Sequence, residues 1–456
     1  MIATLYISSI PAIILSVVFI AFVYLFKKPI NAFYFILFFI FYKSFYIFIG
    51  TRFDIWSLIS LLFILMFFIS WSKNYIENSK NKYETFIIIF VFYVIIISFI
   101  NLFFLDEETI RQMSGGFFKN EGRIVSQIIF FILTINLIFI SSRLIKNHEN
   151  IKMMILLLLK SFILLSILGI VQYIFVIFLG QENPFPIHGS DGLHHSGYIT
   201  DLMFRINSIA GEPKHMGIAM STAIVLIILS KIHKLNLFKY EIFWLITFLF
   251  NLFMTFSTTG YVLTLVGLLV VFILNGLISI KNFLYFILFA FLIFLVLTNL
   301  SDNLIFFFEK QFSKASMEVQ DDAIFKYLFE ENIFHSIIGT GLGNIHYYAV
   351  DYLPINFPLF RDTPFKANTG FMYMVSEYGI IGMLILYITT ILLILKNLYY
   401  TRILKIVYPE EIIIIQLTVV FSIVFLFRYY EFFFLLLGVM IAMNKYFIKR
   451  IEHESN

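Results

Sequence analysis

The sequence predicts an all-α polytopic membrane protein, and two observations carry this prediction. Of its 456 residues, 61% are hydrophobic and only 13% are charged, which is far more apolar than the core of a water-soluble protein requires. The apolar residues also gather in runs of about 17–25, each long enough to cross the hydrocarbon layer as a helix. We therefore expect one integral membrane domain over residues 1–456.

About thirteen such runs follow one another along the chain. They cover residues 5–26, 30–49, 55–71, 86–105, 124–140, 153–179, 215–230, 242–256, 261–280, 283–298, 371–396, 412–427 and 432–447. Close pairs of runs around Gly260 and Lys281 fit either two helices or a re-entrant bend. The chain has no cysteine, which excludes disulfides and thiolate metal sites.

The orientation follows from lysine and arginine, which favour the cytoplasmic side of short loops. One alternate set of loops, together with the C-terminal end, carries more than half of the 32 Lys and Arg residues, whereas the other set carries most of the 28 Asp and Glu residues. The first set is predicted to be cytoplasmic. Two large loops, residues 180–214 and 299–370, then face outward and hold most of the polar mass.

The end of the first large outer loop is rich in ionisable residues. Residues 205–217 read RINSIAGEPKHMG, which we term the charged segment; it holds Arg205, Glu212, Lys214 and His215. Gly211 and Pro213 predict a turn followed by a helix start. Free N–H groups at a helix start and nearby cations attract an anion, and Glu212 can order the cations or accept a proton. The alternative is interfacial charge that anchors a helix.

The second large outer loop ends in the same way. Arg361 and Lys366 precede a predicted span, and Glu377 lies about two turns into it. A carboxylate at that depth is costly unless it is paired or hydrated. Both outer loops thus combine cations, a helix start and a carboxylate.

These motifs resemble those of the Wzy-type O-antigen polymerases and the related O-antigen ligases. The resemblance includes R-x-x-x-x-x-G-E-P-x-x-x-G in the charged segment, STTGYVLTLVGLL at residues 257–269, and IIGTGLGN followed by ANTGFMYMVSEYGIIG. It covers residues 205 to 385, in order. It implies a bundle of the GT-C type and a glycosyltransferase, a polysaccharide polymerase that builds O-antigen or capsular polysaccharide in the bacterial inner membrane.

In the reaction that the resemblance implies, an undecaprenyl-pyrophosphate-linked oligosaccharide is cut at its anomeric carbon and transferred to an acceptor sugar hydroxyl. This chemistry requires cations on the departing pyrophosphate and a base near the hydroxyl. Arg205 and Arg361 are the first candidate cations, and Lys214 and Lys366 the second. The candidates for the base or for positioning the substrate are Glu212, His215, His346 and Glu377.

The partners expected are therefore the lipid-linked oligosaccharide and membrane lipids, with a chain-length regulator as a further candidate and no nucleic acid. No cofactor is expected, and the transfer is expected to be metal-independent. The chain has no G-x-x-x-x-G-K-[ST] motif, and the glycines of GTGLGN at residues 339–344 are interpreted as a backbone turn.

Two alternatives remain open. The first is an O-antigen ligase or a related glycan polymerase of the same fold. Ligases of the family carry a His-Asn pair where this chain has Asn368 and Thr369, which disfavours the ligase. The alternative of another class is a flippase or other transporter, although transporters usually place ionisable residues near the membrane midplane.

Other polar clusters support weaker interpretations. HGSDGLHH holds His188, Asp191, His194 and His195 without a fixed spacing, so a polar loop is favoured over a metal site. MEVQDDAIFKYLFEEN predicts an amphipathic helix with Ala323, Ile324, Tyr327 and Leu328 on its apolar face and Asp321 or Asp322 as its N-cap. Lys43 and Lys160 lie inside predicted spans, where we expect them to be paired or to snorkel; a role with polyprenyl phosphate is the alternative.

Overall fold

In the computed structural model, most of the described residues form helices. The described residues are 2–49, 51–70, 81–104, 121–181, 183–185, 198–200, 203–235, 237–276, 319–354, 365–427 and 430–455. Within these ranges, two short antiparallel hairpins interrupt the helices. β1 (Tyr46–Ile49) pairs with β2 (Thr51–Asp54), and β3 (Tyr198–Thr200) pairs with β4 (Met203–Phe204).

Seven of the described helices are long and apolar enough to cross a membrane, which identifies a polytopic membrane protein. They are α4 (Lys82–Phe103), α6 (Glu121–Leu144), α7 (His148–Tyr173, continued by the π-helix Ile174–Phe178), α8 (Pro213–Ile232), α17 (Gly370–Ile403), α18 (Pro409–Phe427) and α19 (Phe432–Ser455). Five further helices have shorter apolar stretches: α1 (Ile2–Lys27), α2 (Pro29–Phe39), α3 (Ile55–Ser70), α9 (Glu241–Met254) and α10 (Thr258–Leu274).

The predicted count of thirteen spans is not established. The run predicted at 283–298 and the break at Lys281 lie outside the described residues. The prediction of a span over 30–49 is wrong, because α2 has only 11 residues and the β1–β2 hairpin follows it. Such a helix is about 16 Å long, against about 30 Å of hydrocarbon. The pair of runs around Gly260 forms two helices, α9 and α10, with Gly260 inside α10.

Local sequence explains where several helices begin. Proline occupies the start of α2, α8 and α18, where its missing N–H group is not needed. The Asn147 side chain accepts a hydrogen bond from Asn150 N at the start of α7, and the Ser257 side chain accepts one from Gly260 N at the start of α10. These residues therefore fix where the helices begin, directly after the turns that precede them.

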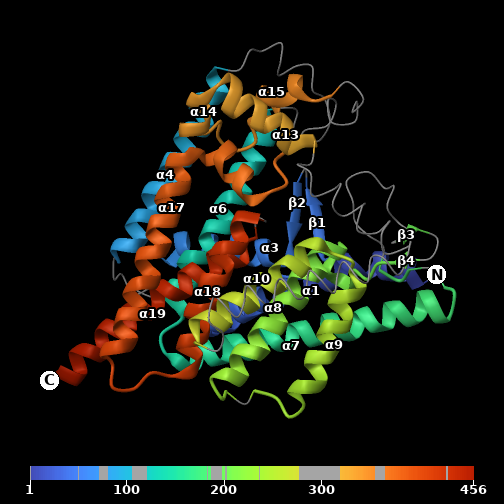
Figure 1. Cartoon of the computed structure of the whole chain (residues 1–456), viewed down its shortest axis with the longest axis vertical. Coiled ribbons are helices and arrows are strands. Elements are labelled where there is room, and N and C mark those ends of the chain that lie inside the picture. The colour runs from blue at the N-terminus through green and yellow to red at the C-terminus, as the bar shows by residue number, and fades with distance from the viewer. Residues whose placement is uncertain are drawn as a thin grey trace.

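Contacts of the described residues sort the helix ends into two groups, which match the predicted alternation of loops. At one end, Lys445 pairs with Glu84 at 2.7 Å, Arg450 pairs with Glu411 at 2.9 Å, and the ring of His148 stacks on Tyr408. These residues flank loops that were predicted to be cytoplasmic. In Figure 1 the C-terminus lies at the lower left, whereas the N-terminus and β3–β4 lie at the right and α13–α15 at the top. Which end faces the cytoplasm stays a prediction.

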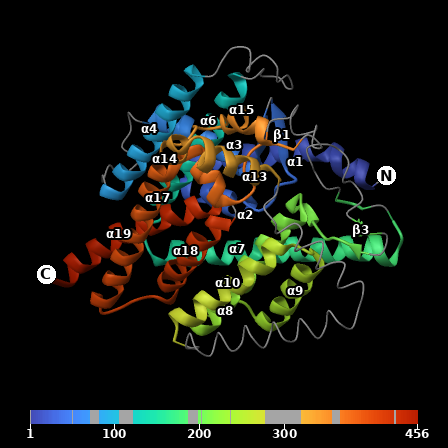
Figure 2. The same cartoon turned by 45° about the horizontal axis from the view of Figure 1, so that its top comes forward.

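The second large outer loop contains short helices where it is described. They are α13 (Val319–Phe325), the π-helix Lys326–Glu331, α14 (Ile333–Ile338) and α15 (Ile345–Ala349). The predicted apolar face is confirmed, because Ala323, Ile324, Tyr327 and Leu328 are buried in the core. Figure 2 shows α7, α8, α9 and α10 close to one another, and α18 packs against α7, α8 and α10.

Candidate functional site

The charged segment folds as a tight turn that leads directly into α8. Residues 208–210 form one turn of 3₁₀-helix, Gly211 follows with a φ of 88°, and Pro213 begins the helix. An added Cβ at Gly211 would lie only 3.3 Å from the carbonyl carbon of Lys43. The predicted turn and helix start are therefore confirmed, and both the positive φ and the close approach require glycine.

Buried amides hold this turn from the side of α7. Gln172 donates to Asn207 Oδ1 at 2.6 Å and accepts from the backbone N–H groups of Asn207 and Ser208 at 3.1 and 2.8 Å. The Asn207 amide in turn donates to Gly211 O at 3.3 Å. Sequence reasoning missed both residues, although a glutamine inside a predicted span was a signal that a polar partner lay nearby.

Arg205 joins the charged segment to the turn between α9 and α10. Its Nε donates to Thr255 O at 3.0 Å and its Nη2 donates to Phe256 O at 3.4 Å, so these two bonds leave part of the guanidinium fork for other acceptors. Burial lowers the pKa of Arg205, and the nearby Tyr261 and Glu212 partly offset this change. The side chain is half-buried and stays cationic at neutral pH.

The three other ionisable side chains of the charged segment are also half-buried, at the start of α8. Lys214 Nζ pairs with Glu212 Oε2 at 2.6 Å, with side chains that are 36% and 27% exposed. The His215 ring lies 6.2 Å from the ring of Tyr430, measured between centroids. The four ionisable side chains of the charged segment are therefore partly exposed, although Nδ1 of His215 is buried.

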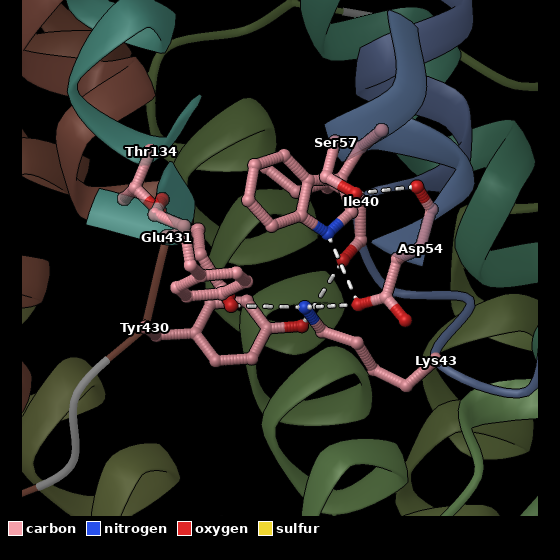
Figure 3. A network of polar contacts seen from close by, with 9 residues as sticks. Ile40, Lys43, Asp54, Ser57, Thr134, Tyr430 and Glu431 are labelled. Atoms are coloured by element: carbon pink, nitrogen blue, oxygen red, sulfur yellow. Dashed lines mark hydrogen bonds and ion pairs between the residues drawn. The ribbon is translucent and has the colours of Figure 1, made fainter. Parts of the chain in front are cut away.

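A buried ion network lies next to the charged segment (Figure 3). Lys43 Nζ donates to Asp54 Oδ2 at 3.1 Å and to Glu431 Oε1 at 3.0 Å. Trp56 Nε1 also donates to Asp54 at 3.2 Å, and the Lys43 ammonium lies 5.1 and 5.6 Å from the ring centroids of Trp56 and Tyr430. The expectation that Lys43 is paired is confirmed, whereas Lys160 lies exposed on α7.

Residues predicted from the second outer loop lie in another group, around the start of α17. Asp321 accepts hydrogen bonds from the N–H groups of Asn368 and Thr369 at 2.7 and 3.0 Å. The prediction that Asp321 or Asp322 is the N-cap of its own helix is wrong, because α13 begins at Val319 and both residues lie in its first turn. Asp321 instead bonds the main chain just before α17, and Asp322 pairs with Lys326. The Asn368 side chain donates to Gln320 Oε1.

Two other residues of this second group differ in exposure. His346 is fully buried, with its Nδ1 accepting from Phe365 N and its ring 4.8 Å from that of Phe365. Lys366 is exposed, and its ammonium lies 5.9 Å from the Tyr373 ring centroid. Lys366 therefore lies at the surface, whereas His346 forms part of the packing.

Glu377 lies at a break in α17. The helix is interrupted at Gly379, where φ is 69° and ψ is 169°. The turn of residues 339–343, which we term the glycine turn, crosses the break: Thr340 N donates to Ser376 O at 2.7 Å, and Gly341 N to Glu377 O at 3.1 Å. Its three glycines have positive φ, so the prediction of a backbone turn is confirmed. Glu377 itself is only 1% exposed.

Several predicted residues cannot be placed. Arg361 and the cluster of His188, Asp191, His194 and His195 lie outside the described residues. Among the residues that are described, no group of three or more His, Cys, Asp or Glu side chains is arranged to hold a metal ion.

Comparisons with known proteins add no relative. No protein-family model, curated protein or solved structure matches this chain. The functional argument therefore depends on the residues and contacts described above.

Proposed function

We propose that this chain is a membrane-embedded glycosyltransferase that polymerises lipid-linked oligosaccharide at the outer leaflet. The observation that carries the proposal is the charged segment, where a half-buried arginine, glutamate, lysine and histidine are held rigidly at the start of a helix long enough to span the membrane. The thirteen-helix bundle of the GT-C type, the outward orientation and the bacterial inner membrane are parts of the same proposal.

In the proposed reaction, the acceptor hydroxyl oxygen attacks the anomeric carbon of the donor sugar. The bond between that carbon and the pyrophosphate oxygen breaks, and undecaprenyl pyrophosphate leaves with the electron pair. Cleavage of the glycosyl pyrophosphate supplies the free energy for the transfer, so ATP is not needed. Arg205 and Lys214, which are both half-buried, stabilise the negative charge on the leaving group.

The proton of the acceptor hydroxyl goes to a base in the same segment. Glu212 and His215 are the first candidates, since both side chains are half-buried, although Nδ1 of His215 is itself buried. Glu377 and His346, at 1% and 0% exposure, require a rearrangement before they can touch a substrate. Lys366 is exposed and Asn368 half-buried, so both are candidates for contact with the acceptor glycan.

A transporter of lipid-linked glycan is the second candidate, and a specific observation favours it. Transporters often contain discontinuous helices and buried charges, and this chain has a break in α17 and the Lys43 ion network. However, main-chain hydrogen bonds from the glycine turn occupy the carbonyls at the break, which favours a fixed joint over a moving one.

The test is chain growth by purified protein in detergent, where transport cannot be scored. Given lipid-linked repeat units of defined structure, the protein should produce a ladder of longer glycans, and a chelator should not abolish it. Folded protein that makes no ladder in detergent but moves the same lipid across vesicles would replace the polymerase with the transporter. Activity that is lost with EDTA and restored by one divalent metal would redirect attention to His188 and Asp191.

A further inference from the structure

The Lys43 ion network joins three parts of the chain that are distant in sequence. Lys43 lies in the turn after α2, Asp54 ends the β1–β2 hairpin, and Glu431 directly precedes α19, 388 residues after Lys43. All three side chains are less than 10% exposed (Figure 3). The network therefore fixes the positions of the two turns and the hairpin relative to one another.

Lys43 and residues next to Lys43 and Glu431 in the sequence lie against the charged segment. The main chain of the Lys43 turn lies against Gly211, and Ser44 N donates to Ile209 O at 3.1 Å. Tyr430, the neighbour of Glu431, packs its ring near that of His215. The charged segment is thus contacted both by the turn that contains Lys43 and by Tyr430, which precedes Glu431.

We propose that Lys43 is a positioning residue, which sets the place of the Gly211 turn and of His215 through its bonds to Asp54 and Glu431. The functional part of this inference rests on the proposed transferase, but the structural part does not. Two carboxylates already contact the Lys43 ammonium, and they would repel an anionic pyrophosphate. Lys43 therefore acts through the segment that it supports and does not touch the substrate.

Buried ion pairs contribute little net stability compared with well-packed apolar groups, whereas they fix geometry well. If the network had only a general structural role, neutralising any buried carboxylate that pairs with a cation should have the same effect on the charged segment. The chain offers a matched control, because Glu84 at the opposite end pairs with Lys445 and its side chain is 9% exposed, as is that of Glu431.

The experiment compares Glu431→Gln with Glu84→Gln by cysteine labelling. Because the natural chain has no cysteine, a single Lys214→Cys reporter can be labelled with a maleimide without background. We expect Glu431→Gln to change the labelling rate at position 214 by about threefold or more, and Glu84→Gln to change it by less than about 1.5-fold, since only the first loosens the charged segment. Thermal unfolding in detergent checks that both variants are folded.

Turnover supplies the second readout, in chains that keep Lys214. We expect Glu431→Gln to lower kcat about tenfold with little change in KM, as misplacement of catalytic groups does. Lys43→Arg, which keeps a cation between the carboxylates, should retain more activity than Lys43→Met. If Glu431→Gln gives no folded protein, Lys43→Arg and Lys43→Met are compared by labelling instead.

The outcomes separate this inference from the proposed function. Equal labelling changes in the Glu431 and Glu84 variants, or no change in either, would overturn the positioning role whatever the activity. A selective change in labelling, in a folded protein that builds no polymer, would support the positioning of the charged segment and reject the transferase.

Discussion

The charged segment and the start of α17 were predicted to contribute the same kinds of group, but the structure holds them in different ways. Side-chain amides and the Lys43 ion network hold the charged segment, and its ionisable groups stay half-buried. Main-chain contacts hold the glycine turn against α17, and Glu377 and His346 are buried there. Similar residue types therefore serve different purposes in the two regions.

Under the proposed function, this difference favours the charged segment as the region that performs chemistry. A group that binds and releases a substrate must be reachable, whereas a joint between two backbones must exclude side chains. Arg205 and Glu212 meet the first condition. Gly339 and Gly379 meet the second, because a Cβ on either would lie within 2.7 Å of main-chain atoms of the other segment. The predictions below test this division, from the largest expected effect to the smallest.

Gly379→Ala should have the largest effect, on assembly itself. Its Cβ would lie 2.3 Å from the carbonyl carbon of Ile338, and the required φ of 69° is unfavourable for alanine. We expect a loss of about 3 kcal/mol or more, with little monodisperse protein recovered in detergent.

Gly180→Ala is the control for this variant. Gly180 also has a positive φ, of 58°, but nothing lies within 4 Å of its added Cβ. The loss there should be about 1 kcal/mol. Equal yields of the two variants would show that the glycine turn is not a close joint.

Arg205→Lys should have an intermediate effect, on activity alone. The substitution keeps the charge but removes the fork that reaches Thr255 O, Phe256 O and a phosphate oxygen together. We expect normal yield and a loss of polymerisation of about tenfold or more, measured as ladder formation. Glu212→Gln should be impaired as well.

Arg143→Lys makes the same replacement at the opposite end, where Arg143 is also half-buried. It should leave ladder formation nearly unchanged. If Arg205→Lys and Glu212→Gln build polymer at wild-type rates, the charged segment is an interface anchor and the chemistry lies elsewhere.

Acidification should have the smallest effect. It should slightly raise hydrogen exchange in α14, which lies next to the glycine turn. Burial lowers the pKa of His335 below its ordinary value of 6.5, and its ring contacts Tyr327. The folded state thus disfavours the protonated ring, so the stability that His335 contributes is present above pH 6.5 and is lost as the pH falls through the lower, folded-state pKa. Between pH 7.5 and 5.5, we expect hydrogen exchange in α14 to rise by no more than about threefold after correction for intrinsic rates.

His335→Gln should remove this pH dependence, since glutamine does not titrate. α8 is the internal control, because an effect confined to the second region should leave its exchange unchanged. A larger rise in α8 than in α14 would contradict the assignment to His335.

The sequence by itself determined the features that depend on neighbouring residues and on the membrane. Long apolar runs predicted the seven long helices, because a bilayer requires every backbone polar group in its core to be bonded within the helix. Pro213 marked the start of α8, and the spacing of Ala323, Ile324, Tyr327 and Leu328 identified the buried face of α13 and of the π-helix after it. These signals are local, so one sequence suffices to detect them.

Only the tertiary structure decided which polar groups meet. Lys43 was expected to be paired, but Asp54 and Glu431 became its partners because the β1–β2 hairpin replaced a predicted helix and brought Asp54 back. Asp321 likewise bonds the main chain just before α17, 47 residues away, instead of capping its own helix. Many acids and amides were chemically able to fill these roles. The choice among them was made by the packing of distant segments, because a buried charge or amide is tolerated only where that packing brings its partner within hydrogen-bonding distance.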